Sequence, residues 1–287
     1  MKVGLFAPFA NPYATPEYIE ALGKGAEERG FDSLWVAEHV VLFDDYESAY
    51  PYAEDGKIPV PAESGILDPF ISLTYLAGCT TTIRLGTGIC LVPQRNPVYT
   101  AKEAATVDWL SNGRLELGIG VGWLAEEFQA LGVPFEHRGS RCRDYIAVLK
   151  TLWCDDVSQF DGDYYTLPPT RQFPKPVQQP HPPLHFGGES DAALRRVAEL
   201  GQGWYGFNLT PDELKERLQR LDTLLERRGR TRDDIEISIC PYMLPATPET
   251  IQGYREAGVD RVILTALAAD AAGLPVVLDS LAGFVEA

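Results

Sequence analysis

The sequence predicts an α/β fold, a closed (β/α)8 TIM barrel, and two observations support that prediction. Short apolar runs alternate with amphipathic stretches along the chain, and they form eight pairs with no apolar run left over. Alternating strand and helix patterns indicate a parallel sheet, and eight units in 287 residues match the size of a closed barrel. A doubly wound sheet with extra strands is the alternative that this pattern leaves open.

Each expected strand is a short apolar run between turn residues. The strands are expected at residues 3–7, 33–37, 85–93, 114–119, 183–186, 203–207, 235–240 and 261–264. Helices are expected at 15–29, 68–80, 97–110, 138–153, 191–200, 210–228 and 248–257, with a last helix ending the chain. Several of them begin at a capping residue followed by proline.

Two additions to the simple barrel are expected. A long polar and aromatic loop covers residues 41–65 after strand two. An insertion between strands four and five contains a further helix and a hairpin near 160–169. Barrels of about 250 residues often form one domain, so we expect a single domain over residues 1–287.

Composition narrows the classes of function. The net charge of −16 disfavours nucleic acid and anionic membranes as partners. The count of five cysteines is odd, without CxxC spacing, and supports neither a disulfide scaffold nor a zinc cluster. No apolar run approaches the roughly 20 residues of a membrane span, and Lys2 leads straight into a strand-like run instead of a secretory signal. A cytoplasmic protein that acts on a small-molecule substrate is expected.

The third expected strand, "LGTGICLVP", contains Gly86 and Gly88 in its interior. Glycine weakens a strand and leaves no side chain to pack, so an interior pair requires a structural or functional reason. Because barrel enzymes place their sites at the C-terminal ends of the strands, the end of this strand is a candidate site.

His39 is the candidate for proton transfer. It follows Glu38 at the end of strand two, and histidine titrates near neutral pH. A structural histidine is the alternative. His181 and His185 flank two prolines, which rules out a helical zinc pair, and no metal site is expected.

Two glycine-rich stretches follow strands four and five. In "LGIGVGW" the GxGxxG pattern fails because position 123 is Trp, so either close backbone packing or a flat ligand explains the glycines. Trp123 and Glu126 there form either a pocket wall with a polar contact, or a core aromatic and a first-turn acid. "GGES" is either an anion site at a helix N-terminus or an ordinary turn. A strand-end rim poor in metal ligands favours chemistry supplied by an organic cofactor.

Three stretches resemble a known family. "ERGFDSLWVAEH", the block from "IRLGTGICLVPQRNP" to "GRLELGIGVGWLAEEFQALG", and "FGGESDAALRRVAELGQGW" are similar to the bacterial luciferase-like superfamily. Within it they most resemble the coenzyme F420-dependent oxidoreductases. The resemblance is close over strands one to six and looser in the C-terminal third.

The resemblance implies a site as well as a fold. F420, or FMN as the alternative, would lie across the barrel mouth with its ring on strand three, beside a non-proline cis peptide at Gly88–Ile89. Glu38 and His39 would lie near the reactive edge, and Arg95 could meet the anionic tail of F420. Trp35 and Trp123 would lie near the ring. The implied cofactor-binding residues are Gly88, Ile89, Cys90, Leu91, Val121, Gly122, Trp123, Glu126, Gly187, Gly188, Ser190, Gly206 and Phe207.

The resemblance also implies an activity: hydride transfer between F420 and an unidentified small organic substrate, with His39 exchanging the proton. An FMNH2-dependent monooxygenase that uses O2 is the alternative, and a non-catalytic cofactor-binding barrel is the second. The glucose-6-phosphate dehydrogenase branch carries other residues at positions 38, 123 and 126, so that activity is not transferred. A homodimer is implied by the resemblance alone.

Overall fold

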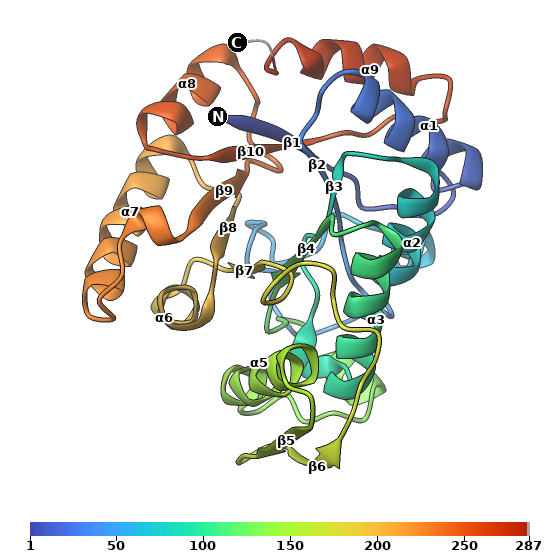
Figure 1. The fold of residues 1–287 in the computed structure, drawn as a ribbon. Helices are drawn as coiled ribbons and strands as arrows, with labels where there is room; N and C mark the ends of the chain where they lie inside the picture. Colours follow the sequence, from blue (N-terminus) through green and yellow to red (C-terminus); the bar gives the residue numbers. More distant parts are fainter. Residues whose placement is uncertain (286–287) are drawn as a thin grey trace.

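The apolar runs of the sequence pair in parallel and close into a barrel (Figure 1). The structure is a computed structural model and describes residues 1–285. Neighbouring strands follow the order β1-β10-β9-β8-β7-β4-β3-β2, and β1 pairs with both β10 and β2, which closes the sheet. The predicted (β/α)8 barrel is therefore confirmed. The strands are β1 (Lys2–Phe6), β2 (Ser33–Val36), β3 (Arg84–Thr87), β4 (Leu115–Ile119), β7 (Leu184–Gly187), β8 (Gly203–Phe207), β9 (Glu236–Cys240) and β10 (Arg261–Thr265).

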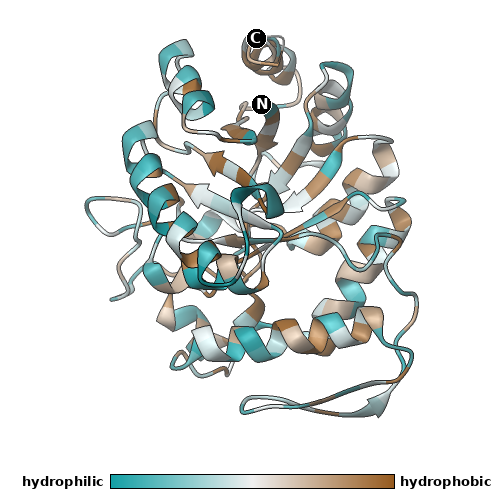
Figure 2. Cartoon of the chain, turned by 60° about the vertical axis from the view of Figure 1, so that its left-hand side comes forward, coloured by the Kyte–Doolittle hydropathy of each residue, from teal (hydrophilic) through white to brown (hydrophobic). Residues whose placement is uncertain are grey.

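Helices surround the barrel, and Figure 2 shows both hydrophilic and hydrophobic residues along them. Their N-termini follow the capping residues that the sequence indicated: Thr15 accepts from the Tyr18 amide, Asp68 from the Ile71 amide, and Thr210 forms a capping box with Glu213. None of the helices in residues 1–285 is both long and apolar enough to cross a membrane. The helices are α1 (Pro16–Glu28), α2 (Pro69–Cys79), α3 (Pro97–Leu110), α4 (Ala125–Ala130), α5 (Arg138–Cys154), α6 (Asp191–Leu200), α7 (Pro211–Glu226), α8 (Pro248–Glu256) and α9 (Leu274–Ala282).

Both expected additions are present. The insertion between β4 and β7 contains α4, α5 and an antiparallel pair, β5 (Ser158–Asp161) and β6 (Thr166–Thr170), which lies away from the barrel in Figure 1. The loop after β2 covers residues 41–65 and contains one short 3-10 turn, Ala62–Ser64. It returns to the barrel rim, where Tyr52 contacts Phe207 at the end of β8.

Strand β3 is shorter than the sequence predicted. It ends at Thr87, and only Cys90 continues the pairing, through an isolated bridge to Ile119. The next amide, of Leu91, donates to the Glu38 carboxylate instead of a neighbouring strand. Pro93 has no amide to donate, so the chain leaves the sheet as a 3-10 turn over Val92–Gln94. The peptide bond Gly88–Ile89 is cis, as the resemblance implied.

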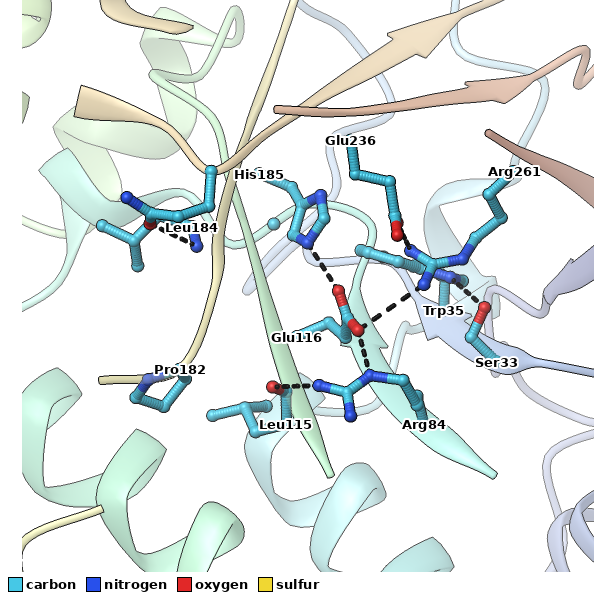
Figure 3. Close-up of polar contacts among 12 residues, drawn as sticks. Ser33, Trp35, Arg84, Leu115, Glu116, Pro182, Leu184, His185, Glu236 and Arg261 are labelled. Carbon is cyan, nitrogen blue, oxygen red and sulfur yellow. Dashed lines mark hydrogen bonds and ion pairs between the residues drawn. The ribbon is translucent and has the colours of Figure 1, made fainter. Parts of the chain in front are cut away.

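A network of charged side chains occupies the barrel interior near the N-terminal ends of the strands (Figure 3). Glu116 of β4 is at its centre: one carboxylate oxygen lies 2.5 Å from His185 Nε2, and the other accepts from Arg84 and lies 3.5 Å from Arg261 Nη2. Arg261, fully buried, also pairs with Glu236 at 2.5 Å. Burial raises the pKa of Glu116, but His185, Arg261 and Arg84 outweigh it and hold that pKa far below its usual range.

We expect Glu116→Gln to destabilise the fold by about 3 kcal/mol, because the change leaves buried cations without their counter-charge. A carboxyl with a lowered pKa stabilises the folded state above its ordinary pKa and loses that contribution as the pH falls. The difference between variant and wild type should therefore shrink below about pH 4. Urea unfolding of both proteins at several pH values measures this difference in the free energy of unfolding.

The control is Glu199→Gln, because Glu199 pairs with Arg143 and Arg228 at the surface. Surface changes of this kind usually alter the free energy of unfolding by less than about 0.5 kcal/mol. Equal effects of the two substitutions would contradict a special role for the Glu116 network.

Candidate active site

A cavity of about 350 Å³ opens at the C-terminal ends of the strands. Its wall is mostly apolar and aromatic, with contributions from the strand ends, from the loop after β2 and from the start of α6. This is the end of a barrel at which sites occur, and a concave apolar surface with few polar groups is typical of ligand pockets.

Most of the sequence-predicted site residues meet at this cavity. Those that line it are Glu38, His39, Gly88, Ile89, Leu91, Val121, Gly122, Trp123, Gly187, Gly188, Ser190 and Phe207. Three predicted residues do not line it. Cys90 is fully buried, Gly206 packs near Ile239, and Glu126 faces the loop after β2.

Ile89 forms a shelf at the centre of the cavity wall. Its side chain occupies the space that two glycines leave open, because a Cβ at Gly120 or at Gly187 would lie 2.5 Å from Ile89 Cδ1. Both glycines are therefore required for close packing of β3, β4 and β7. The cavity wall at this point is therefore the aliphatic side chain of Ile89, just after the end of β3.

His39 is held by a residue that the sequence did not single out. Glu127, fully buried in α4, lies 3.1 Å from His39 Nδ1 through Oε2, which also accepts from Gln94 Nε2 at 2.8 Å. Its Oε1 accepts from the Val40 amide at 2.6 Å. Because this carboxylate can only accept, the Nδ1 of His39 carries a proton that faces Glu127, and Nε2 is left for contact with a ligand. In the sequence, Glu127 is the second of two first-turn acids, with nothing to distinguish it from Glu126.

Glu38 does not pair with His39. It is buried against Arg95, and its second oxygen accepts from the Leu91 amide. Burial raises the pKa of Glu38, while Arg95 and the Leu91 amide oppose that shift. Arg95 also pairs with Glu103 at 2.8 Å and lies 3.6 Å from Asp68. Carboxylates of the chain therefore already neutralise Arg95, and Arg95 does not line the cavity. Its contact with an anionic cofactor tail, which would have to compete with these carboxylates, stays a prediction.

The loop after β2 is fastened over the cavity by two acids. Glu126 accepts from the Glu47 and Ser48 amides, at 2.7 and 3.1 Å. Glu189 accepts from the Tyr52 hydroxyl and the Phe207 amide, both at 3.0 Å. Burial raises the pKa of Glu189 to about 7, although these two hydrogen bonds lower it.

The aromatic part of the loop covers Trp123. Its ring centroid lies 5.7 Å from Tyr46, 5.1 Å from Tyr50 and 5.9 Å from His39. Trp123 is therefore a cavity wall between the loop and the candidate proton-transfer residue. Trp35, also expected near a ring ligand, lies instead fully buried inside the barrel, where it contacts Tyr205.

The opposite end of the cavity is suited to an anion. Gly188 has a positive φ of 98°, and Ser190 caps α6 by accepting from the Ala193 amide. Arg196 lines the cavity there and is paired with no carboxylate among residues 1–285. Burial lowers the pKa of Arg196; the Cys142 thiol opposes this shift, and the nearby Arg143 and Arg138 add to it. A buried, unpaired guanidinium in a cavity that the start of α6 also lines fits a phosphate.

One group of potential metal ligands exists among the described residues, outside the cavity. Glu116, His185 and Glu236 lie within reach of a common ion. Both carboxylates are already paired with guanidinium groups, Glu116 with Arg84 and Glu236 with Arg261 (Figure 3). The cluster therefore fits a structural ion network better than a cation site.

Comparison with known proteins identifies the family. The sequence profile of the family described as luciferase-like monooxygenase matches residues 1–273, so the chain belongs to this family. An uncharacterised protein of Mycobacterium tuberculosis is 32% identical over 210 residues, which cover 73% of this chain and 72% of that protein. The oxygenase component of a flavin-dependent trigonelline monooxygenase of Acinetobacter baylyi is 38% identical over 119 residues, 41% of this chain and 33% of that protein.

Solved structures share the fold. An F420-dependent secondary alcohol dehydrogenase, in complex with an F420–acetone adduct, superimposes with a TM-score of 0.78 at 18% identity and covers 99% of this chain and 98% of its own. The oxygenating constituent of 3,6-diketocamphane monooxygenase from Pseudomonas putida, in complex with FMN, gives 0.67 at 17% identity over 84% and 66%. The chain therefore belongs to the luciferase-like monooxygenase family, and its structural neighbours include F420- and FMN-dependent enzymes.

We expect Glu127→Gln to change the protonated nitrogen of His39. The Gln amide can donate to Nδ1 where Glu127 only accepts, so the proton should move to Nε2. The ¹⁵N chemical shifts of the His39 ring measure this. Glu126→Gln is the matched control, because Glu126 contacts the loop and not His39. Identical ring shifts in both variants would show that Glu127 does not set the tautomer.

Proposed function

We propose that the protein is an F420-dependent oxidoreductase that transfers a hydride between the deazaflavin and a small organic substrate. The observation that carries the proposal is the cavity itself, which the aliphatic side chain of Ile89 and the unpaired Arg196 both line. A planar ring with a phosphate-bearing side chain matches both features. The F420-dependent structural neighbour supports this cofactor.

In this proposal one group of lining residues binds the ring of the cofactor and another binds its phosphate. Ile89 and Leu91 support one face of the ring, and Trp123 bounds its edge. Ser190, Gly188 and Arg196 hold the phosphate. The bound cofactor supplies the hydride chemistry. His39 exchanges the accompanying proton through Nε2, which the Glu127 contact at Nδ1 leaves free. The loop after β2 excludes water from the site.

An FMNH2-dependent monooxygenase that uses O2 is the second candidate. The trigonelline monooxygenase component is flavin-dependent, and the diketocamphane monooxygenase structure contains FMN. The same shelf and phosphate end would hold FMN. The cytoplasmic location suggested by the sequence belongs to both proposals, and the five cysteines, all free, agree with it.

Binding of reduced F420 and of FMN, measured side by side, tests the function. We expect F420 to bind more tightly and to quench Trp123 fluorescence, with no oxygen uptake. Tight FMN binding, with oxygen consumption that depends on substrate once FMN is supplied in its reduced form, would favour the monooxygenase. No quenching by either cofactor would favour a non-catalytic barrel.

For the first substrate turned over, we expect His39→Ala to reduce kcat by about 10²- to 10⁴-fold at unchanged cofactor affinity, because the proton then has no positioned carrier. His181→Ala is the control, because His181 lies outside the cavity. Unchanged turnover by His39→Ala with cofactor bound would contradict the proton role.

We expect Arg196→Gln to weaken FMN and F420 binding by roughly tenfold to a hundredfold, which corresponds to one charge-assisted hydrogen bond. Riboflavin and dephosphorylated F420 lack the phosphate and should bind both proteins equally. Arg227→Gln, at an exposed position after α7, is the control. An equal loss for ligands with and without phosphate would show that Arg196 supports the fold instead.

We also propose that the protein forms a homodimer through α2 and α3, which pack side by side (Figure 1). Their outer face exposes large apolar side chains that a solvated surface rarely carries together. These are Ile71, Tyr75, Tyr99, Trp109 and Leu110. Analytical ultracentrifugation at micromolar concentration tests this, and a monomer would contradict it.

A further inference from the structure

One wall of the cavity faces the Ile89 shelf from across the barrel. In the closed strand order, β10, β1 and β9 stand opposite β4, β7 and β3 (Figure 1). The ends of these three strands contribute a separate set of lining residues. They are Phe6 and Pro8 after β1, Tyr242 after β9, and Thr265 and Leu267 at β10. We call this set the facing wall.

We propose that the facing wall binds the substrate, and that the substrate is an uncharged, largely apolar compound with a carbonyl or hydroxyl oxygen bonded to Thr265. The inference rests on the proposed function, because a ring held on the Ile89 shelf would turn its other face toward this wall.

The charge distribution of the cavity carries the first half of this inference. The facing wall has no acidic or basic residue. The ionisable lining residues Glu38, His39 and Arg196 come from the end of β2 and from α6. Glu38 is paired with Arg95, and the phosphate takes Arg196. The facing wall therefore offers no counter-charge to a carboxylate or an ammonium group of a ligand. Because a buried ion without a partner is strongly disfavoured, a charged substrate is not expected there.

Unsatisfied hydroxyls carry the second half. Thr265 Oγ1 is buried and has no hydrogen-bond partner among the described residues. Tyr205, from β8 between the two walls, has a buried Oη without a hydrogen-bond partner among the described residues, and the Cys240 thiol near it is only a weak hydrogen-bonding group. A buried polar atom without a partner costs about 1–3 kcal/mol, a cost that a ligand oxygen removes.

Aromatic contacts explain the preference for an apolar body. Phe207 and Tyr242 lie 4.6 Å apart between ring centroids, and Phe6 packs against both at about 6 Å. Tyr52 joins this cluster from the loop after β2. Such a surface gains free energy mainly by removing apolar area of the ligand from water.

The test measures binding to protein loaded with cofactor. Cyclohexane and benzene rings are each supplied as the methyl ketone, the carboxylate and the aminomethyl cation, and dissociation constants are measured by ligand-observed NMR. We expect the ketones to bind at least tenfold more tightly than either ion. Equal or tighter binding of an ion, or no binding of any ketone up to millimolar concentration, would overturn the inference.

Three variants locate the contact. Thr265→Val should weaken ketone binding by three- to tenfold at unchanged cofactor affinity, whereas Thr223→Val, on the exposed face of α7, should change neither. Leu267→Lys adds a cation to the facing wall and should let the carboxylates bind. Continued rejection of carboxylates, or full ketone affinity in Thr265→Val, would contradict the placement.

Cofactor affinity, measured on the same samples, distinguishes a failure of the proposed function from a failure of the inference about the substrate. Wild-type protein that binds neither F420 nor FMN would contradict the proposed function. Protein that binds cofactor but not ketones would contradict only the inference about the substrate.

Discussion

The fold depends on burying charge in pairs. Arg261, at the start of β10, is fully buried and meets Asp32, Glu236 and Glu116 from three other parts of the barrel. Glu116 extends the network to His185 on β7 and Arg84 on β3. Because an unpaired charge in this interior would be very costly, each strand has to take the register that completes the pairs. The network also explains Gly203, since a Cβ there would lie 2.0 Å from His185 Nδ1.

Above this network the acids around the cavity act mainly as clamps. Glu38 fastens the end of β3, Glu127 fastens His39 and the chain after it, and Glu126 and Glu189 fasten the loop after β2. Each accepts hydrogen bonds from the backbone near the site. The cavity is consequently apolar although the chain carries a net charge of −16. The net charge of the molecule therefore does not indicate the charge of the ligand, because these acids are already bound to groups of the chain itself.

The site could be located from the sequence because barrel strands end at one rim. Counting strands placed His39, Gly88 and "GGES" at the same end of the barrel, and all three meet at the cavity. The reason for the glycines could not be read locally. Gly120 and Gly187 are 67 positions apart in the sequence, and both have to be glycine because the side chain of Ile89, which follows β3, lies close to each of them.

The sequence by itself determined the number, order and caps of the elements, because these follow from local periodicity and from short-range hydrogen bonds such as that of Thr210 with Glu213. Together with the matching family profile it also determined the class of protein. The tertiary structure alone decided which acid serves His39: Glu126 and Glu127 are adjacent in a first turn, and a rotation of 100° around the helix separates the two directions. It also decided that Arg95 is neutralised and Arg196 is not. Pairing between charges depends on distances across strands, which no spacing along the chain reports.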